Sequence, residues 1–410
     1  MARLSSSILF VLAVIILRLV YSVIQYRHHQ AKALRRGCGS LPALPRKDPL
    51  GFVRIFKLLK AKREQNFLPF VAALFDSAGH DVYTVSDRLM GRNIIWTRDP
   101  ENMRAILTSQ VKDFDIGVAR VGSLGPLIGN GIFLNSNEAW RHSRTLLRPQ
   151  FARVQRYAQW YVKAALQRKK FEDRRANPVT KTKFDLIDEL VNVSQNEEEI
   201  RNESLNVLGA GRSTTAALLG WVFYHLARHP TIYDKLRKVI LAQFGTFEDP
   251  RDITFENLKG CQYLHCCINE TFRRTPNIPF NIREALRDTT LPTGGGPHGS
   301  QPVFVPKGTE IYLSYYPVNM RTDIWGDDVE DFRPERFEGR KFSWAFTPFG
   351  AGQRSCMGQQ FALTEAAYLL VRFLQRYDKM ENLEEPGPIR YNYMISSRSG
   401  TGVQVRLHKC

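Results

Sequence analysis

The spacing of apolar and polar residues predicts a chain built mainly from amphipathic helices. A period near 3.6 residues runs through Gln359–Tyr377, Ile200–Arg228 and Leu264–Arg274, so each segment presents one apolar face. In the first segment this face consists of Phe361, Leu363, Ala367, Leu370, Val371 and Leu374. Two short apolar runs, Val303–Val305 and Thr309–Leu313, flank a Pro-Lys-Gly turn and are predicted as strands. The predicted fold class is therefore mainly α with small β-sheets (α+β).

The N-terminal hydrophobic run predicts a membrane anchor. Ile8–Ile24 is largely apolar and would form a helix of about 25 Å, slightly short of a hydrocarbon core of about 30 Å. Arg18 interrupts the run, but a long side chain near the interface can reach water. More basic residues follow the run than precede it, which predicts a cytosolic position for the rest of the chain. The following ones are Arg27, Lys32, Arg35 and Arg36, against Arg3 before the run. A cleaved signal peptide is the alternative, but no small-residue cleavage site follows.

The predicted organisation has three parts. Residues 1–26 form the anchor, and residues 27–50 form a basic, proline-containing hinge that includes Gly37–Pro45. Residues 51–410 form one catalytic domain, because a hydrophobic fraction of 43% supports a large core and no internal repeat divides it.

Composition excludes some classes of function. The six cysteines contain no pair of Cys-x-x-Cys units, which favours free thiols in a reducing compartment over a zinc site. The net charge of +18 is spread along the chain and mixed with acidic residues, so it does not predict nucleic-acid binding. A membrane surface or an acidic flavin reductase is the better partner for such a surface.

The strongest chemical signal is the glycine-rich segment around Cys356. Gly350, Gly352 and Gly358 allow a tight turn and a close approach to a flat ligand. Cys356 precedes the helix predicted from Gln359, and a helix N-terminus stabilises a thiolate. These features predict a thiolate ligand for a haem iron. The alternative from the residues alone is a buried cysteine in a turn.

This segment resembles, residue by residue, the haem-binding signature of the cytochrome P-450 (haem-thiolate monooxygenase) family. The matching residues are Phe349, Gly352, Arg354, Cys356 and Gly358. The resemblance implies haem b as cofactor, with its iron held by the Cys356 thiolate as axial ligand, and the cytochrome P-450 fold.

Three further charged residues match the family's structural network. Glu270 and Arg273 form its Glu-x-x-Arg motif within a predicted helix, where residues three apart are neighbours. Arg336 belongs to a Pro-Glu-Arg-Phe element similar to that of the family. The resemblance implies a buried network that secures the proximal side of the haem. An ordinary surface pair is the alternative for the first two residues.

Other matches imply haem propionate contacts. Trp140 and Arg144 resemble the family's Trp-x-x-x-Arg motif and lie one helical turn apart, so an indole N–H and a guanidinium could face one carboxylate. Arg283 lies in a stretch whose arginine reaches the other propionate in the family. His142 has no second ligand spaced with it and is expected to be a surface histidine.

The oxygen-activating helix of the family is matched by Gly209–Thr215. Its two interior glycines each cost roughly 1 kcal/mol relative to alanine, and the resemblance explains them by a widening of the helix over the haem. Thr214 matches the threonine that binds oxygen, but the preceding acidic residue is replaced by Ser213. A hydroxyl relays a proton but holds no negative charge near neutral pH, so we expect weakened or rerouted proton delivery.

The resemblance to the fungal microsomal branch that hydroxylates alkanes and fatty acids implies the rest of the function. We expect insertion of one oxygen atom into a C–H bond of a lipid-like substrate, with electrons from NADPH through a flavin reductase, at the endoplasmic reticulum membrane. Docking residues would be Arg141, Arg148, Arg340 and Lys341, and pocket segments would be Val118–Ile128, Gly209–Thr214, Ile278–Ile282 and Met394–Ser397.

The interval between Arg144 and Gly209 is much shorter than in the family. The matching stops near Arg153 and resumes near Tyr157, which predicts that part of the helical roof over the substrate pocket is missing. Loss of that roof would reduce the exclusion of water from the site. Two alternatives therefore remain: a shortened, non-catalytic haem or membrane-associated protein, and a hydroperoxide-rearranging relative that needs no proton delivery.

Overall fold

The computed structural model describes residues 2–79, 81–149 and 190–410, with some side chains of the first and fifth helices left out. Helices dominate these ranges, and the predicted class, mainly α with small β-sheets, is confirmed. The helices are α1 (Ala2–Arg35), α2 (Phe52–Arg63), α3 (Phe67–Asp76), α4 (Pro100–Arg104), α5 (Val118–Ile128), α8 (Glu197–Arg228), α9 (Pro230–Phe244), α10 (Phe255–Gly260), α11 (Gln262–Arg274), α12 (Tyr315–Asn319), α13 (Thr322–Trp325) and α14 (Gln359–Arg376). Residues 137–149 are also helical.

The described strands form one five-stranded sheet and three two-stranded sheets. The strands are β1 (Thr84–Leu89), β2 (Arg92–Thr97), β3 (Phe114–Asp115), β4 (Phe280–Ala285), β5 (Thr289–Gly295), β6 (Gln301–Val305), β7 (Glu310–Ser314), β8 (Tyr377–Asn382), β9 (Tyr391–Tyr393), β10 (Ser397–Ser399) and β11 (Val405–Lys409). The larger sheet has the order β1-β2-β7-β4-β3, and the pairs are β5-β6, β9-β10 and β8-β11. Only β2 and β7 pair in parallel.

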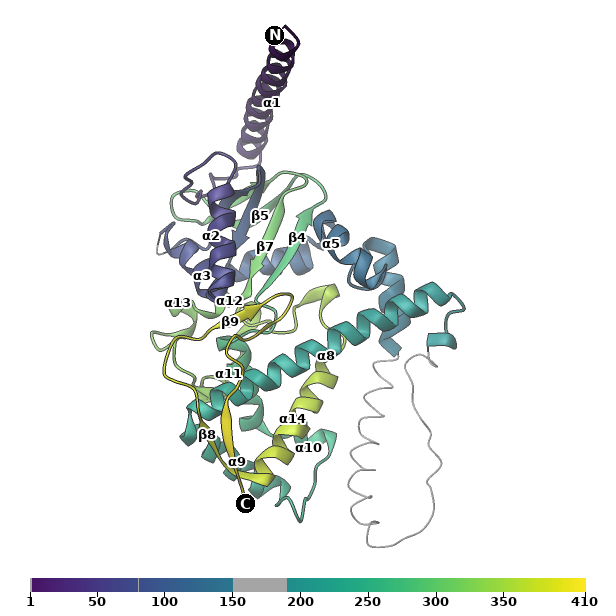
Figure 1. Cartoon of the computed structure of the whole chain (residues 1–410), viewed down its shortest axis with the longest axis vertical. Helices are drawn as coiled ribbons and strands as arrows, with labels where there is room; N and C mark the ends of the chain where they lie inside the picture. Colours follow the sequence, from purple (N-terminus) through teal and green to yellow (C-terminus); the bar gives the residue numbers. More distant parts are fainter. Residues whose placement is uncertain (1, 80, 150–189) are drawn as a thin grey trace.

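The helices predicted from periodicity are confirmed within a few residues. α14 and α11 begin and end close to the predicted bounds, and α8 begins at Glu197 because the side chain of Asn196 caps it by accepting from the backbone N–H of Glu199. The C-terminal half of α8 packs with α9, α11 and α14 into one apolar core. Figure 1 shows α8 crossing the middle of the molecule, with the large sheet near one end.

The N-terminal helix is longer than predicted and is attached to the domain. α1 continues to Arg35, through the first residues of the expected hinge, and projects from one end of the molecule (Figure 1). Lys32 forms a 2.6 Å ion pair with Asp288, and Arg36 donates to the Asp288 carbonyl. Several side chains of the expected anchor Ile8–Ile24 lie outside the description. Within the described part of the chain, no helix is long and apolar enough to cross a membrane.

The rest of the expected hinge lies against the sheets. The Gly39 N–H donates to Pro302 O at 2.9 Å, and the Ser86 N–H donates to Pro42 O at 2.8 Å. Leu44 is buried in the core next to the large sheet. The expected shortening near residues 153–157 lies outside the described residues, as does the interval up to residue 189.

Candidate functional site

The loop that carries Cys356 is held by backbone contacts that only glycine permits. Gly350 and Gly352 have φ angles of 68° and 69°, in the left-handed region. A Cβ on Gly352 would collide with the carbonyl oxygen of Leu107, so the loop approaches that segment more closely than another residue would allow. The Cys356 N–H donates to Phe349 O at 2.9 Å, which closes the turn. The predicted bare loop ahead of a helix is confirmed.

The Cys356 thiol is accessible although protein surrounds it. The side chain is exposed to solvent, and α14 begins three residues later. Partial desolvation raises the pKa of Cys356, while the Gly358 N–H and the positive charge of Arg144 act in the opposite direction. The prediction of a thiol stabilised as an anion is therefore met only in part in the absence of a cation. A bound metal ion deprotonates a thiol outright.

Arginine side chains gather beside this loop with few acidic groups. Burial lowers the pKa of Arg354 to about 10, and repulsion by Arg283 and Arg120 adds to the effect, against the attraction of Asp115. Burial and repulsion by Arg283 likewise lower the pKa of Arg120 to about 10. Arg354 forms a 2.7 Å ion pair with Asp115. A buried group of three cations with this one carboxylate favours binding of further carboxylates.

The helix at 137–149 brings Trp140 and Arg144 to the same place. The Arg144 guanidinium carbon lies 5.6 Å from the centre of the Trp140 ring, and that of Arg354 lies 4.5 Å from it. Trp140 is buried. Arg144 also donates to Ser355 O at 3.0 Å. Arg283, the other expected propionate contact, is buried and donates to Asn281 Oδ1 at 2.9 Å.

These residues fit the haem that the sequence predicts. Among the described residues, no group of three His, Cys, Asp or Glu side chains could hold a metal ion by itself. A single accessible thiol therefore suits an iron whose other ligands come from a prosthetic group. The excess of cations at Arg120, Arg283 and Arg354 suits a group that carries two carboxylates.

Glu270, Arg273 and Arg336 form the predicted buried network. Arg273 donates twice to the Glu270 carboxylate, at 2.7 and 2.8 Å, and both side chains are fully buried. Arg336 Nε lies 3.6 Å from Glu270 Oε1 and is also buried. The backbone N–H of Arg333 donates to Glu270 at 2.9 Å. This network ties α11 to the Pro334–Phe337 turn, and the surface-pair alternative is wrong.

The oxygen-activating segment differs from the expected geometry. α8 is a regular α-helix through Gly209–Thr214, so the expected widening is wrong for this structure. The reason is local: Thr214 Oγ1 donates to Ala210 O at 2.6 Å and Ser213 Oγ donates to Gly209 O at 3.2 Å, so both hydroxyls bond within the helix. Asn277 Nδ2 donates to Thr214 O at 2.7 Å.

The expected pocket segments converge on α8. Asn206 donates to Ile128 O at 3.1 Å, which attaches the end of α5 to α8. Asn277, beside the stretch Ile278–Ile282, reaches Thr214 and accepts a backbone hydrogen bond from Ser397. Exposed apolar side chains occur on all these elements, namely Leu127, Leu208, Met394 and Ile395.

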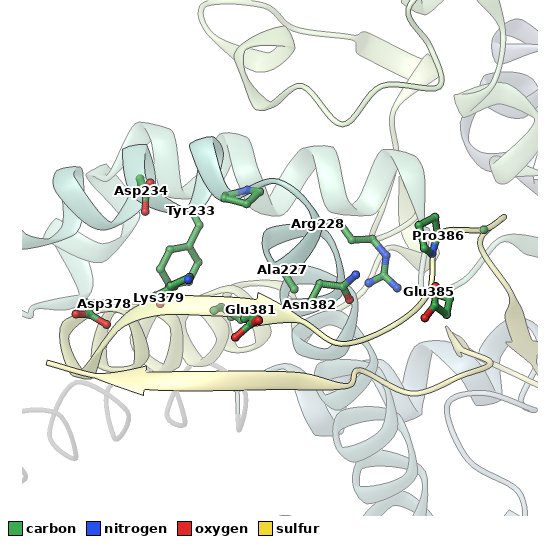
Figure 2. Close-up of a pocket in the computed structure, with 13 residues that line it drawn as sticks. Ala227, Arg228, Tyr233, Asp234, Asp378, Lys379, Glu381, Asn382, Glu385 and Pro386 are labelled. Atoms are coloured by element: carbon green, nitrogen blue, oxygen red, sulfur yellow. The ribbon is translucent and has the colours of Figure 1, made fainter.

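A separate cavity of about 730 Å³ lies between the end of α8, α9 and β8. Figure 2 shows its mixed lining, which includes Arg228, Tyr233, Glu381 and Asn382. Arg228 is already paired with Glu384 at 2.8 Å, and Glu381 is paired with Arg406. Its lining residues come from none of the segments that surround Cys356, so the cavity has no part in the site.

Sequence reasoning missed Asp115, Arg120 and Asn277. Asp115 contacts Arg354 across a separation of 239 residues, so no local spacing reveals the pair. His142, expected as a free surface residue, is exposed but lies 2.7 Å from Glu199 Oε1.

Comparisons with known proteins agree with this site. A family model for cytochrome P-450 matches residues 152–399. The chain is 32% identical to the cytochrome P-450 monooxygenase g430 of a Fusarium species, with 96% of this chain and 88% of that protein covered. It is 34% identical to the cytochrome P-450 monooxygenase alt2 of Alternaria solani (92% and 93% covered) and 31% identical to cytochrome P-450 52A12 of Debaryomyces hansenii (90% and 92% covered).

The alignments also bear on chain length. The alignment with the Fusarium protein runs over 506 positions, more than the 410 residues of the whole chain. That relative therefore carries internal residues without a counterpart here.

Proposed function

The chain belongs to the cytochrome P-450 family of haem-thiolate monooxygenases, and on this premise we propose that it hydroxylates alkanes or fatty acids at a membrane. One observation carries the site assignment: the accessible Cys356 thiol lies beside a buried cluster of arginines. We assign Cys356 as the axial ligand, and Trp140, Arg144, Arg283 and Arg354 as the residues around the propionates.

The residues of this chain would then divide the work. A haem with a thiolate ligand supplies, when bound, the electron density that favours cleavage of dioxygen. Phe349, Gly352 and Gly358 shape the loop and hold the thiol at the end of α14. Glu270, Arg273 and Arg336 keep the proximal elements together.

On the distal side we assign Thr214 and Ser213 to proton delivery. Thr214 Oγ1 donates to Ala210 in this structure, so the hydroxyl would have to rotate away from the helix to serve oxygen. Ser213 is exposed and can exchange protons with water, but it stores no charge near neutral pH. Proton supply is therefore expected to limit turnover.

The substrate class rests on the apolar surface near this site. Leu127, Leu208, Met394 and Ile395 expose about two thirds or more of their surface, at 73%, 65%, 65% and 66%. A hydrocarbon chain would cover these side chains, and burial of apolar area is the main source of affinity for such a ligand. The resemblance to the fungal branch points to the same class.

Electrons would come from an NADPH-dependent flavin reductase. The docking residues Arg141, Arg148, Arg340 and Lys341 are all exposed, which suits an acidic partner. We place the protein at the endoplasmic reticulum membrane through α1, with the catalytic domain in the cytosol. The basic residues that follow Ile24 support this orientation.

Reconstitution tests the proposal. The purified protein should bind lauric acid or hexadecane with a spectral shift and form hydroxylated product only when the reductase and NADPH are both present. Haem-dependent turnover of another substrate class, with no product from either lipid, would refute the substrate assignment and leave the family unaffected.

A further inference from the structure

The helix α2 leaves an apolar face in solvent. Phe52, Phe56 and Leu59 expose 46%, 69% and 56% of their surface. They are spaced by four and three residues, so they form one stripe along the helix. Ala61 is buried on another face, and α2 packs against α3. The stripe is therefore not needed for packing within the domain.

The stripe continues onto the neighbouring β-hairpin. Leu50 and Met90 expose 46% and 68% of their surface. The Gly91 N–H donates to Leu50 O at 2.8 Å, so the turn between β1 and β2 lies against the start of α2. We call Leu50, Phe52, Phe56, Leu59 and Met90 together the α2 surface. Contiguous apolar surface of this kind marks an interaction site.

The charges around the α2 surface are almost all positive. The twelve residues of α2 include Arg54, Lys57, Lys60, Lys62 and Arg63, and no acidic residue. At 100° per residue, Lys60 and Lys62 fall on opposite sides of the stripe, and both are exposed. Their long stems can lie along apolar surface while the ammonium groups stay in water. Arg54 is not part of this rim, because it pairs with buried Asp87 at 3.2 Å.

We propose that the α2 surface inserts into the interface of a bilayer that contains anionic lipids. An apolar stripe between two rows of cations fits acyl chains below and acidic headgroups beside them. The attachment of α1 agrees with this occupant, because Lys32, Asp288 and Arg36 hold the end of α1 to the domain. Figure 1 shows α1 and α2 at the same end of the molecule, so both can meet one membrane.

This contact is additional to the proposed membrane location. It fixes which face of the catalytic domain touches lipid, and it does not depend on whether α1 spans the bilayer.

Depth-dependent quenching tests the contact in the full chain. Phe56→Trp adds a fluorophore to the α2 surface, and Leu383→Trp adds one at an exposed apolar position, 47% exposed, in the loop after β8. With vesicles of brominated phosphatidylcholine and phosphatidylserine, the added fluorescence of Phe56→Trp should be quenched and that of Leu383→Trp should not. Equal, weak quenching at both positions in a vesicle-bound protein refutes the proposal but not the membrane location. Failure of the protein to bind vesicles refutes both.

The basic rim is tested by charge reversal. Lys60→Glu with Lys62→Glu should lower the affinity for phosphatidylserine vesicles over phosphatidylcholine vesicles by roughly fivefold per lysine. The control, Lys259→Glu with Lys379→Glu, changes two exposed lysines elsewhere by the same charge. An equal loss in both pairs would mean that net charge alone drives binding, and would overturn the assignment of this rim. An unchanged preference would overturn it too.

Discussion

The Arg144 guanidinium donates a 3.0 Å hydrogen bond to the backbone carbonyl of Ser355, the residue before Cys356. The helix at 137–149 is thereby joined to the loop that we propose as the haem ligand loop. The same positive charge lowers the pKa of the Cys356 thiol. One side chain therefore acts on both the position and the charge of the proposed ligand.

Replacement of Cys356 by serine should abolish the thiolate-type Soret band of the reduced, CO-bound protein. A hydroxyl is a far weaker ligand because it does not ionise near neutral pH. Cys410→Ser is the control, because Cys410 is also exposed but lies at the end of the chain. Persistence of the band in Cys356→Ser would refute the ligand assignment.

Replacement of Ser213 by aspartate should improve the coupling of electron use to product. A carboxylate at this exposed position of α8 can take up and release protons, and a positioned acid contributes roughly 100-fold or more to proton transfer. The ratio of product to released peroxide should rise by up to about that factor. Ala216→Asp, another exposed position on α8, controls for the added charge. An unchanged ratio in Ser213→Asp would show that proton supply is not limiting.

Replacement of Glu270 by glutamine should destabilise the fold severely. It leaves the buried Arg273 and Arg336 without their carboxylate, and breaking a buried pair costs about 3–5 kcal/mol. Glu64→Gln removes the exposed partner of Lys60 and should cost less than about 1 kcal/mol. Urea unfolding of both variants measures the difference. Similar midpoints would contradict the role of the network.

Replacement of Asp115 by asparagine should lower the melting temperature of the haem-free protein more than that of the haem-loaded protein. The carboxylate offsets repulsion among Arg354 and its neighbours, and hydrogen bonds to charged groups contribute about 1.5–3 kcal/mol. Bound propionates would supply negative charge in its place. Asp249→Asn, which alters an exposed pair with Arg251, is the control. An equal decrease in both forms would argue against propionates near Asp115.

Acidification should destabilise the protein through His225. Burial lowers the pKa of His225 well below its ordinary value, and Arg274 adds to the effect. As the pH falls below about 6.5, the unfolded chain takes up a proton that the folded chain does not. The free energy of unfolding should therefore decrease by at most about 1.4 kcal/mol per pH unit from this residue.

The variant His225→Phe isolates this contribution. It keeps the ring that stacks on Phe332 at 4.4 Å but does not titrate. Denaturation at about pH 7.5 and 5.5 should show a smaller difference for the variant than for the parent. The same difference in both proteins would refute the assignment to His225.

Local pattern predicted what depends on neighbours in sequence. The helices α8, α11 and α14 follow from periodicity, and the Glu270–Arg273 pair follows from a spacing of three residues. Contacts between distant segments could not be predicted this way. The Asp115–Arg354 ion pair and the Asn277–Thr214 hydrogen bond depend on how β3 and the turn before β4 approach the helices.

The state of α8 at Gly209–Thr214 also escaped prediction. The glycines permit a widened helix, but the choice between wide and regular forms depends on whether the hydroxyls of Ser213 and Thr214 find partners inside the helix. That competition leaves no mark in the sequence.

The Lys32–Asp288 ion pair has a practical consequence for anyone who shortens this protein to obtain it without detergent. Removal of the chain up to Gly37 would delete Lys32 and Arg36 and leave Asp288 without these partners. A cut just before Gln30 would remove the apolar run and keep the attachment to the domain. The better-behaved preparation should therefore be the longer one.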